Sequence, residues 1–72
     1  MIKLRYYPET DSLYIEFRAV PAVDSDEVAE GVVMDVDEAG GVVGFDIDRA
    51  SLRLDLTTLE SVELPARTAR IA

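Results

Sequence analysis

The sequence predicts an α+β, mostly β domain: an antiparallel meander of about four strands with a short C-terminal helix packed on one face. Three observations predict this class. Apolar and polar residues alternate in several segments with the period of two that half-buried strands show. Turn-forming residues separate these segments, as at residues 8–11 and 40–41. Only the last third of the chain carries leucines spaced to form one helical face.

The first element that we expect is a β-hairpin. Residues 2–7 alternate between apolar and polar side chains, and residues 12–18 continue the alternation. Pro8 cannot donate to a strand ladder, and the Asp and Thr that follow it bond locally to backbone, so this tetrapeptide predicts a turn. Residues 20–26 have no regular period and predict a connection. Residues 27–30 predict a short extended piece that rejoins the sheet.

The strongest strand signals are residues 32–36 and 43–48. The connecting segment contains a Gly pair, which supplies the positive φ that a tight reversal demands. If Val36 pairs with Val43, then Asp35 lies opposite Gly44 and diagonal to Asp46. One face of this hairpin is then wholly apolar: Val32, Met34, Val36, Val43, Phe45 and Ile47.

The last third predicts the helical cover for that apolar face. A short helical turn is expected near residues 49–54, and Leu52, Leu56, Leu59 and Val62 continue on one helical face. Leu54 and Leu64 also allow an extended segment. We expect residues 1–65 to form a single compact domain and residues 66–72 to form a flexible tail, because this end carries two bases and no acid.

The composition excludes much protein chemistry. The chain has 72 residues, 15 acids against 7 bases, a net charge of −8, and neither His nor Cys. It therefore lacks the imidazole and thiolate that most catalytic and zinc sites use. We expect no catalytic residues and no cofactor, and hence a protein that is not an enzyme.

The charge distribution indicates which partners are compatible. Residues 24–48 contain nine acids and no base, which disfavours nucleic acid and favours a basic protein or a cation. No apolar run is long enough to span a membrane and no signal peptide is evident, so a cytoplasmic protein is expected. A small chain with 49% apolar residues and no disulfide is also expected to bury an apolar face in a homodimer.

Two motifs resemble a known family. These are Asp-Ser-Leu-Tyr-Ile at residues 11–15 and Asp-Val-Asp-Glu-Ala-Gly-Gly-Val-Val-Gly-Phe-Asp-Ile at residues 35–47. The chain resembles domain of unknown function 2283, a family of small bacterial stand-alone proteins, over most of residues 4–52. The resemblance implies a compact β-rich domain and no established activity, and some members look like the antitoxin half of a toxin–antitoxin pair.

Two groups of outward side chains are candidate sites. The carboxylates Asp35, Asp37 and Asp46, with Glu16 or Asp48 nearby, predict either a divalent-metal site or a solvated face. The aromatic residues Tyr7 and Tyr14 share a face with basic residues, a mixture typical of protein interfaces. The candidate partner-binding residues are Asp35, Asp37, Asp46, Asp48, Tyr7 and Tyr14. Three functions remain open: an antitoxin-like interaction domain, a metal-binding protein or metal-dependent enzyme, and a purely structural homodimer.

Overall fold

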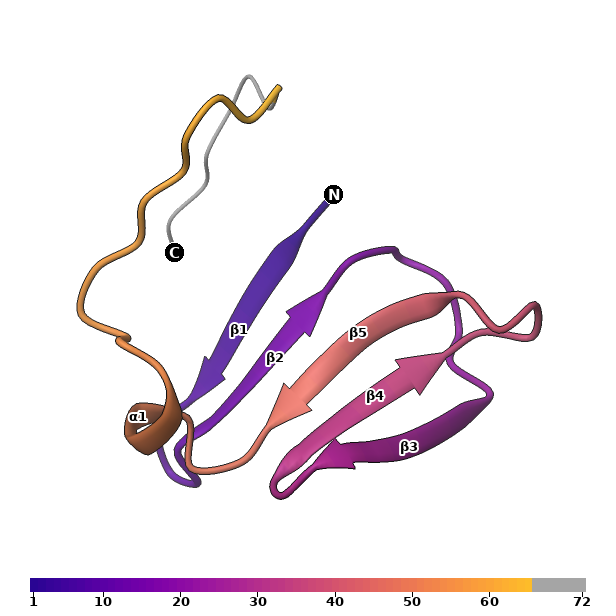
Figure 1. The fold of residues 1–72 in the computed structure, drawn as a ribbon, viewed down its shortest axis with the longest axis horizontal. Coiled ribbons are helices and arrows are strands. Elements are labelled where there is room, and N and C mark those ends of the chain that lie inside the picture. The colour runs from indigo at the N-terminus through magenta and orange to yellow at the C-terminus, as the bar shows by residue number, and fades with distance from the viewer. Residues whose placement is uncertain (66–72) are drawn as a thin grey trace.

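The computed structural model describes residues 1–65, which form one five-stranded antiparallel sheet and a four-residue helix (Figure 1). This arrangement confirms the mostly β class, but the sheet has five strands where about four were expected. The elements are β1 (Lys3–Tyr7), β2 (Ser12–Glu16), β3 (Asp24–Ala29), β4 (Val32–Val36), β5 (Val42–Ile47) and α1 (Ala50–Arg53).

The strand order is β1-β2-β5-β4-β3, so the expected meander order is wrong. The sheet contains a β1–β2 hairpin and a β3–β4–β5 meander, and β5 joins them by pairing with β2. The additional strand is β3, which begins at Asp24, inside the segment expected to be a connection, and continues into the extended piece predicted at residues 27–30. Its backbone pairs with β4 although its first four side chains are polar, because an edge strand needs no apolar face of its own.

The register of the central hairpin agrees with the predicted contact. Asp35 is paired with Gly44, as expected, but Val36 is paired with Val42 rather than with Val43. The extra residue forms a β-bulge, and Val43 is 3% exposed. The five-residue turn explains the shift, because the Asp37 amide donates to the Gly41 carbonyl at 2.9 Å while Gly40 adopts a φ of 83°.

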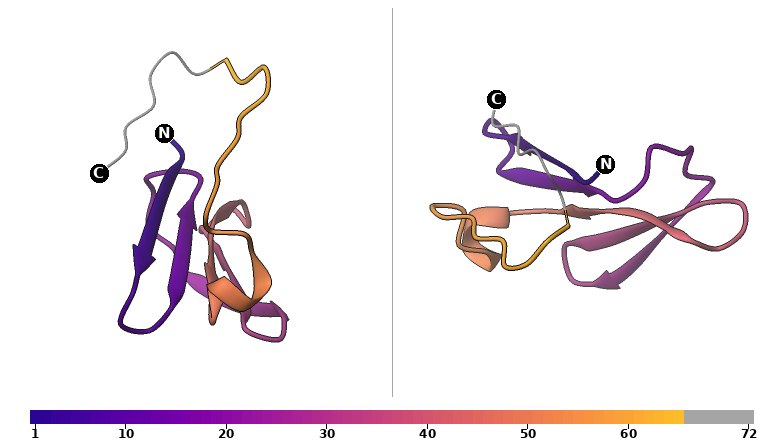
Figure 2. Two further views of the ribbon diagram at one scale, coloured as in Figure 1. Left: turned by 90° about the vertical axis from the view of Figure 1, so that its left-hand side faces the viewer. Right: turned by 90° about the horizontal axis from the view of Figure 1, so that it is seen from above.

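The five strands form a single layer (Figure 2), and the buried apolar cluster lies on one of its faces. Leu13, Ile47 and Ala50 form the buried cluster. Partly buried Ile15, Val32 and Phe45 pack against this cluster. Phe17 extends the cluster through an edge-to-face contact with Phe45, with ring centroids 5.7 Å apart.

The helix does not cover this face, which corrects the prediction of a helix packed on the sheet. α1 buries only Ala50, and no helix continues over residues 54–65. Asp55 accepts hydrogen bonds from the Thr57 amide and hydroxyl and from the Thr58 hydroxyl, and such local bonds compete with helix formation. As a result Leu59 is 80% exposed.

The predicted tail at residues 66–72 lies outside the described residues. Within the described part of the chain, no helix is long and apolar enough to cross a membrane.

Candidate functional site

A hydrogen-bonded chain of side chains crosses the polar face of the sheet. The Tyr14 hydroxyl on β2 donates to Asp35 Oδ2 on β4 at 3.1 Å, and the Ser25 hydroxyl on β3 donates to Asp35 Oδ1 at 2.7 Å. Strand β5 lies between β2 and β4, so the Tyr14 ring must cross it. Asp35 therefore joins three strands through its two carboxylate oxygens.

Gly44 makes this crossing possible. A Cβ at position 44 would lie 2.9 Å from Tyr14 Cζ and would also clash with the Ile15 carbonyl oxygen. A glycine in a strand interior marks such a close approach. Partial burial, and then the hydrogen bond to Asp35, raise the pKa of Tyr14 above its usual value.

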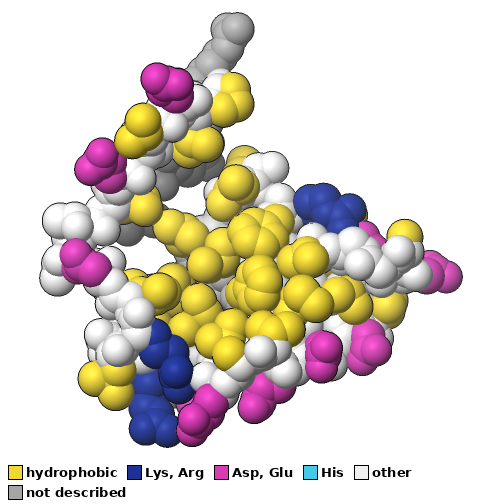
Figure 3. Space-filling view, in the orientation of Figure 1, with side chains coloured by type: hydrophobic (Ala, Val, Ile, Leu, Met, Phe, Trp, Pro, Cys, Tyr) yellow, Lys and Arg dark blue, Asp and Glu magenta, His cyan; other side chains and the backbone are white. Residues whose placement is uncertain are grey.

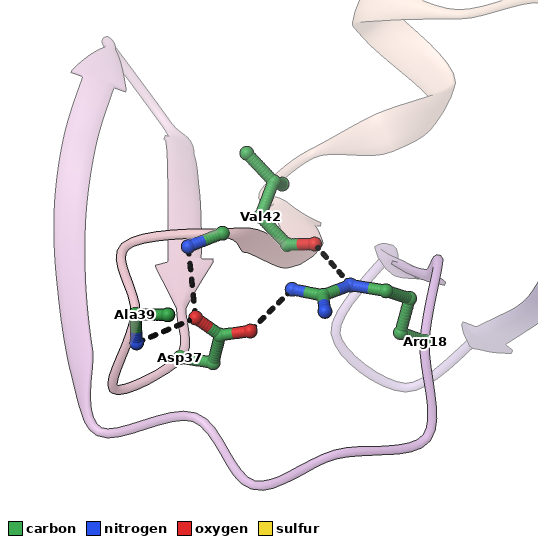
Figure 4. Close-up of polar contacts among 5 residues, drawn as sticks. Arg18, Asp37, Ala39 and Val42 are labelled. Atoms are coloured by element: carbon green, nitrogen blue, oxygen red, sulfur yellow. Dashed lines mark hydrogen bonds and ion pairs between the residues drawn. The ribbon is translucent and has the colours of Figure 1, made fainter.

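Asp37 is committed to the turn that joins β4 and β5 (Figure 4). Its Oδ1 accepts the Gly41 amide at 2.8 Å and the Ala39 amide at 3.0 Å, while Oδ2 forms an ion pair with Arg18. Arg18 also donates to the Val42 carbonyl at 3.3 Å. The Gly41 amide, and then the Arg18 guanidinium, lower the pKa of Asp37. This carboxylate therefore fixes the turn and the end of β2.

The structure does not bring the three candidate metal-ligating carboxylates together. Both oxygens of Asp35 accept hydroxyl groups, and Asp37 faces Arg18. Asp46 is exposed and lies opposite Tyr14 on one side and Val33 on the other. Across residues 1–65, no three acidic side chains are grouped so that they could hold a metal ion.

The two candidate tyrosines do lie together. Tyr7 and Tyr14 line a shallow hollow of about 280 Å³ with Lys3, Arg5 and Glu16. Tyr7 is 42% exposed, so its ring is open to a partner. The hollow thus combines aromatic rings with charges of both signs on the polar face.

The strand order also separates the charges across the sheet. Residues 24–48, with their nine acids and no base, form the contiguous half β5-β4-β3. Every residue of the edge strand β3 is exposed. Asp48 belongs to this half, where its amide donates to the Gly31 carbonyl at 2.8 Å. The opposite edge strand, β1, carries Lys3 and Arg5 and no acid.

Sequence reasoning missed the role of Asp11. This residue has a φ of 54° in the β1–β2 turn, and its carboxylate accepts the Tyr6 hydroxyl at 2.7 Å and the Ser51 hydroxyl at 2.6 Å. Its backbone carbonyl accepts the Ala50 amide at 2.8 Å. The Ser51 hydroxyl, and then the Tyr6 hydroxyl, lower the pKa of Asp11. The available signal was an Asp in a turn, a residue type that tolerates positive φ.

Together these features define a small single-sheet β domain whose polar side chains mainly tie strands and turns to one another. The family model described as "Protein of unknown function (DUF2283)" matches residues 3–51, and the chain belongs to this family. The match confirms the resemblance and spans all five strands together with the contact between Asp11 and Ser51. No curated protein matches the chain significantly, and no solved structure does so.

Proposed function

We propose that this protein is a non-enzymatic interaction domain that binds a basic partner protein through the half-sheet β5-β4-β3. The observation that carries the proposal is the gathering of nine acids, without a base, into one contiguous half that ends at the exposed strand β3. Such a field attracts a cationic surface and accelerates association with it.

An antitoxin-like role is the most specific form of this proposal. The acids of β3 and its turn lie at intervals along an exposed edge, where they resemble a row of phosphates. A basic enzyme that acts on nucleic acid would bind this edge with its cationic active site and would thereby be blocked. Its binding to the domain is expected to weaken as salt screens the charges.

A pull-down with matched variants tests the proposal. The tagged wild-type chain is compared with D26N/E27Q/E30Q, which removes three exposed charges from β3 and its turn, and with E9Q/E60Q/E63Q, which removes three exposed charges elsewhere. Each chain is incubated with native lysate at low and at high salt, and retained proteins are identified by mass.

The expected result is one basic protein that the wild type and the second variant retain at low salt, that the first variant loses, and that high salt releases. Retention that is equal for both variants, or an absence of any basic protein on the wild-type chain, would contradict the proposal.

A further inference from the structure

The apolar face of the sheet is open in the described chain. Figure 3 shows apolar side chains forming a continuous patch over the centre of this face, with acidic side chains along the lower border. Along β1 the patch is open to solvent, since Leu4 is 48% exposed and Tyr6 is 43% exposed, and Ile2 just before the strand is 64% exposed. Contiguous exposed apolar surface of this kind marks a protein interaction site.

The total surface area of the chain is larger than that of a compact monomer of its mass. The chain exposes 6047 Å², whereas a compact monomer of 7.9 kDa exposes about 4,400 Å² by the usual scaling with mass. The excess is roughly 1,600 Å², about twice the 800 Å² per partner that a standard interface buries. Residues 54–65, which are all exposed, contribute to this excess together with the open face of the sheet.

We infer that a second copy of this chain covers the apolar face, so that two sheets pack face to face as a two-fold dimer. The central strand of the five is β5, and it lies on the two-fold axis. Its half-buried Phe45 then contacts the partner near the centre of the interface. Two layers packed in this way supply the core that a single sheet lacks.

Charge selects the direction of the two-fold axis. On the apolar face, Leu4 of β1 and Asp26 of β3 occupy the two ends of one row of paired residues across the sheet. An axis perpendicular to the strands would place β3 over the partner's β3 and bring acid against acid. An axis parallel to the strands places β3 over the partner's β1, so that Asp26 lies next to the partner's uncharged Leu4. The second arrangement is favoured because it avoids the like-charge contact.

The dimer also has a salt dependence opposite to that of the proposed basic partner. Each copy carries a net charge of −8, so the two copies repel each other over long range and salt weakens this repulsion. Higher ionic strength therefore favours self-association, whereas it releases a basic protein from the acidic half. The two proposals can fail independently for this reason.

Sedimentation equilibrium of the untagged wild-type chain at low and high salt is the first test. We expect a dimer whose dissociation constant falls as salt rises. A chain that stays monomeric at both salt concentrations, at protein concentrations up to about 1 mM, would overturn the inference.

Two single substitutions at neighbouring positions of β4 form the matched test. Met34 faces the apolar side, where it pairs with Phe45, and Val33 faces the polar side, where it pairs with Asp46. M34K is expected to raise the dissociation constant at least tenfold, which is about 1.4 kcal/mol or more, while V33K leaves it within about twofold. Equal effects of the two variants would refute the face-to-face arrangement.

Disulfide trapping tests the dimer without introducing a lysine into the sheet. In L4C/D26C the two cysteines of one chain lie at opposite edges of the sheet, so a disulfide forms only between copies. The double variant is expected to give a covalent dimer on mild oxidation, and L4C alone is expected to remain uncrosslinked. Efficient crosslinking of L4C alone would refute the parallel axis, and no crosslinking of the double variant would refute the dimer.

Discussion

Gly44→Ala is expected to destabilise the fold because the new methyl group has no free space. The φ of Gly44 is not in the left-handed region, so alanine is compatible with the backbone and the cost is steric. The Cβ would lie 2.7 Å from the Tyr14 hydroxyl oxygen and against the Ile15 carbonyl, which belongs to a paired strand. If the ring moves away, its hydrogen bond to Asp35 is lost as well.

The magnitude follows from these contacts. Overpacking in a tight site costs about 1–3 kcal/mol, and the lost hydrogen bond adds about 0.5–1.5 kcal/mol. Alanine also restricts the unfolded chain more than glycine does, and this effect offsets about 0.4–1 kcal/mol of the loss in stability. The free energy of unfolding should therefore fall by roughly 1–3 kcal/mol, a large part of the total for so small a domain.

Urea unfolding followed by circular dichroism measures this loss, with G41A as the control. A Cβ at Gly41 meets chiefly the far end of the flexible Arg18 side chain, which can move aside, so G41A should cost less. Adding Y14A removes the ring and should reduce the penalty of G44A. A penalty that is equal in G44A and G41A, or that is unchanged by Y14A, would refute the steric explanation.

Three further predictions concern pH and the turn. The hydrogen bonds that Asp11 accepts, first of all the one from Ser51, lower its pKa in the folded state. This carboxylate therefore adds stability above its unfolded pKa of about 3.9 and loses that contribution as pH falls through the folded value. The stability difference between wild type and D11N, measured by urea unfolding, should therefore shrink below about pH 4, and a constant difference would contradict this. Burial and then the hydrogen bond to Asp35 raise the pKa of Tyr14 in the folded state. This side chain therefore adds stability below about pH 10 and loses that contribution as pH rises through the folded value. In thermal melts, the melting temperature of Y14F should fall less at alkaline pH than that of the wild type. Gly40→Ala should lower the free energy of unfolding by about 1–2 kcal/mol, because alanine disfavours the φ of 83° at this position. An added Cβ would meet no other atom there, so the backbone conformation alone sets the cost. An unchanged urea midpoint would contradict a left-handed turn.

The sequence predicted those elements whose signals are local. The β4–β5 hairpin was predictable because alternating apolar residues flank a turn with the positive φ of Gly40. Strand β3 was not fully predictable, because its first three residues, Asp24, Ser25 and Asp26, are poor strand formers that pair through backbone alone. Alternation also does not specify neighbours, so the pairing of β5 with β2 was not evident.

The site shows the same division. The opposition of Asp35 and Gly44 followed from the turn and the register, and the structure confirmed it. The contact between Asp11 and Ser51 joins residues 40 positions apart, and no local pattern reports such a contact. The helix was overpredicted because the spacing of the leucines indicates a helix. Asp55 instead accepts a hydrogen bond from the Thr57 amide in a local turn, which the spacing of the leucines does not reveal.

The insertion of β5 beside β2 has a consequence for the order of folding. The β1–β2 hairpin and the β3–β4–β5 meander each close over short loops, so each is accessible early. The β2–β5 ladder joins these two units and must wait until a long loop has closed. Tyr14, Gly44 and the Asp11–Ser51 contact all lie along or beside this seam. If the transition state forms at the seam, substitutions there should slow refolding more than they accelerate unfolding. Two peptides obtained by dividing the chain within residues 17–23 should reassemble along the seam.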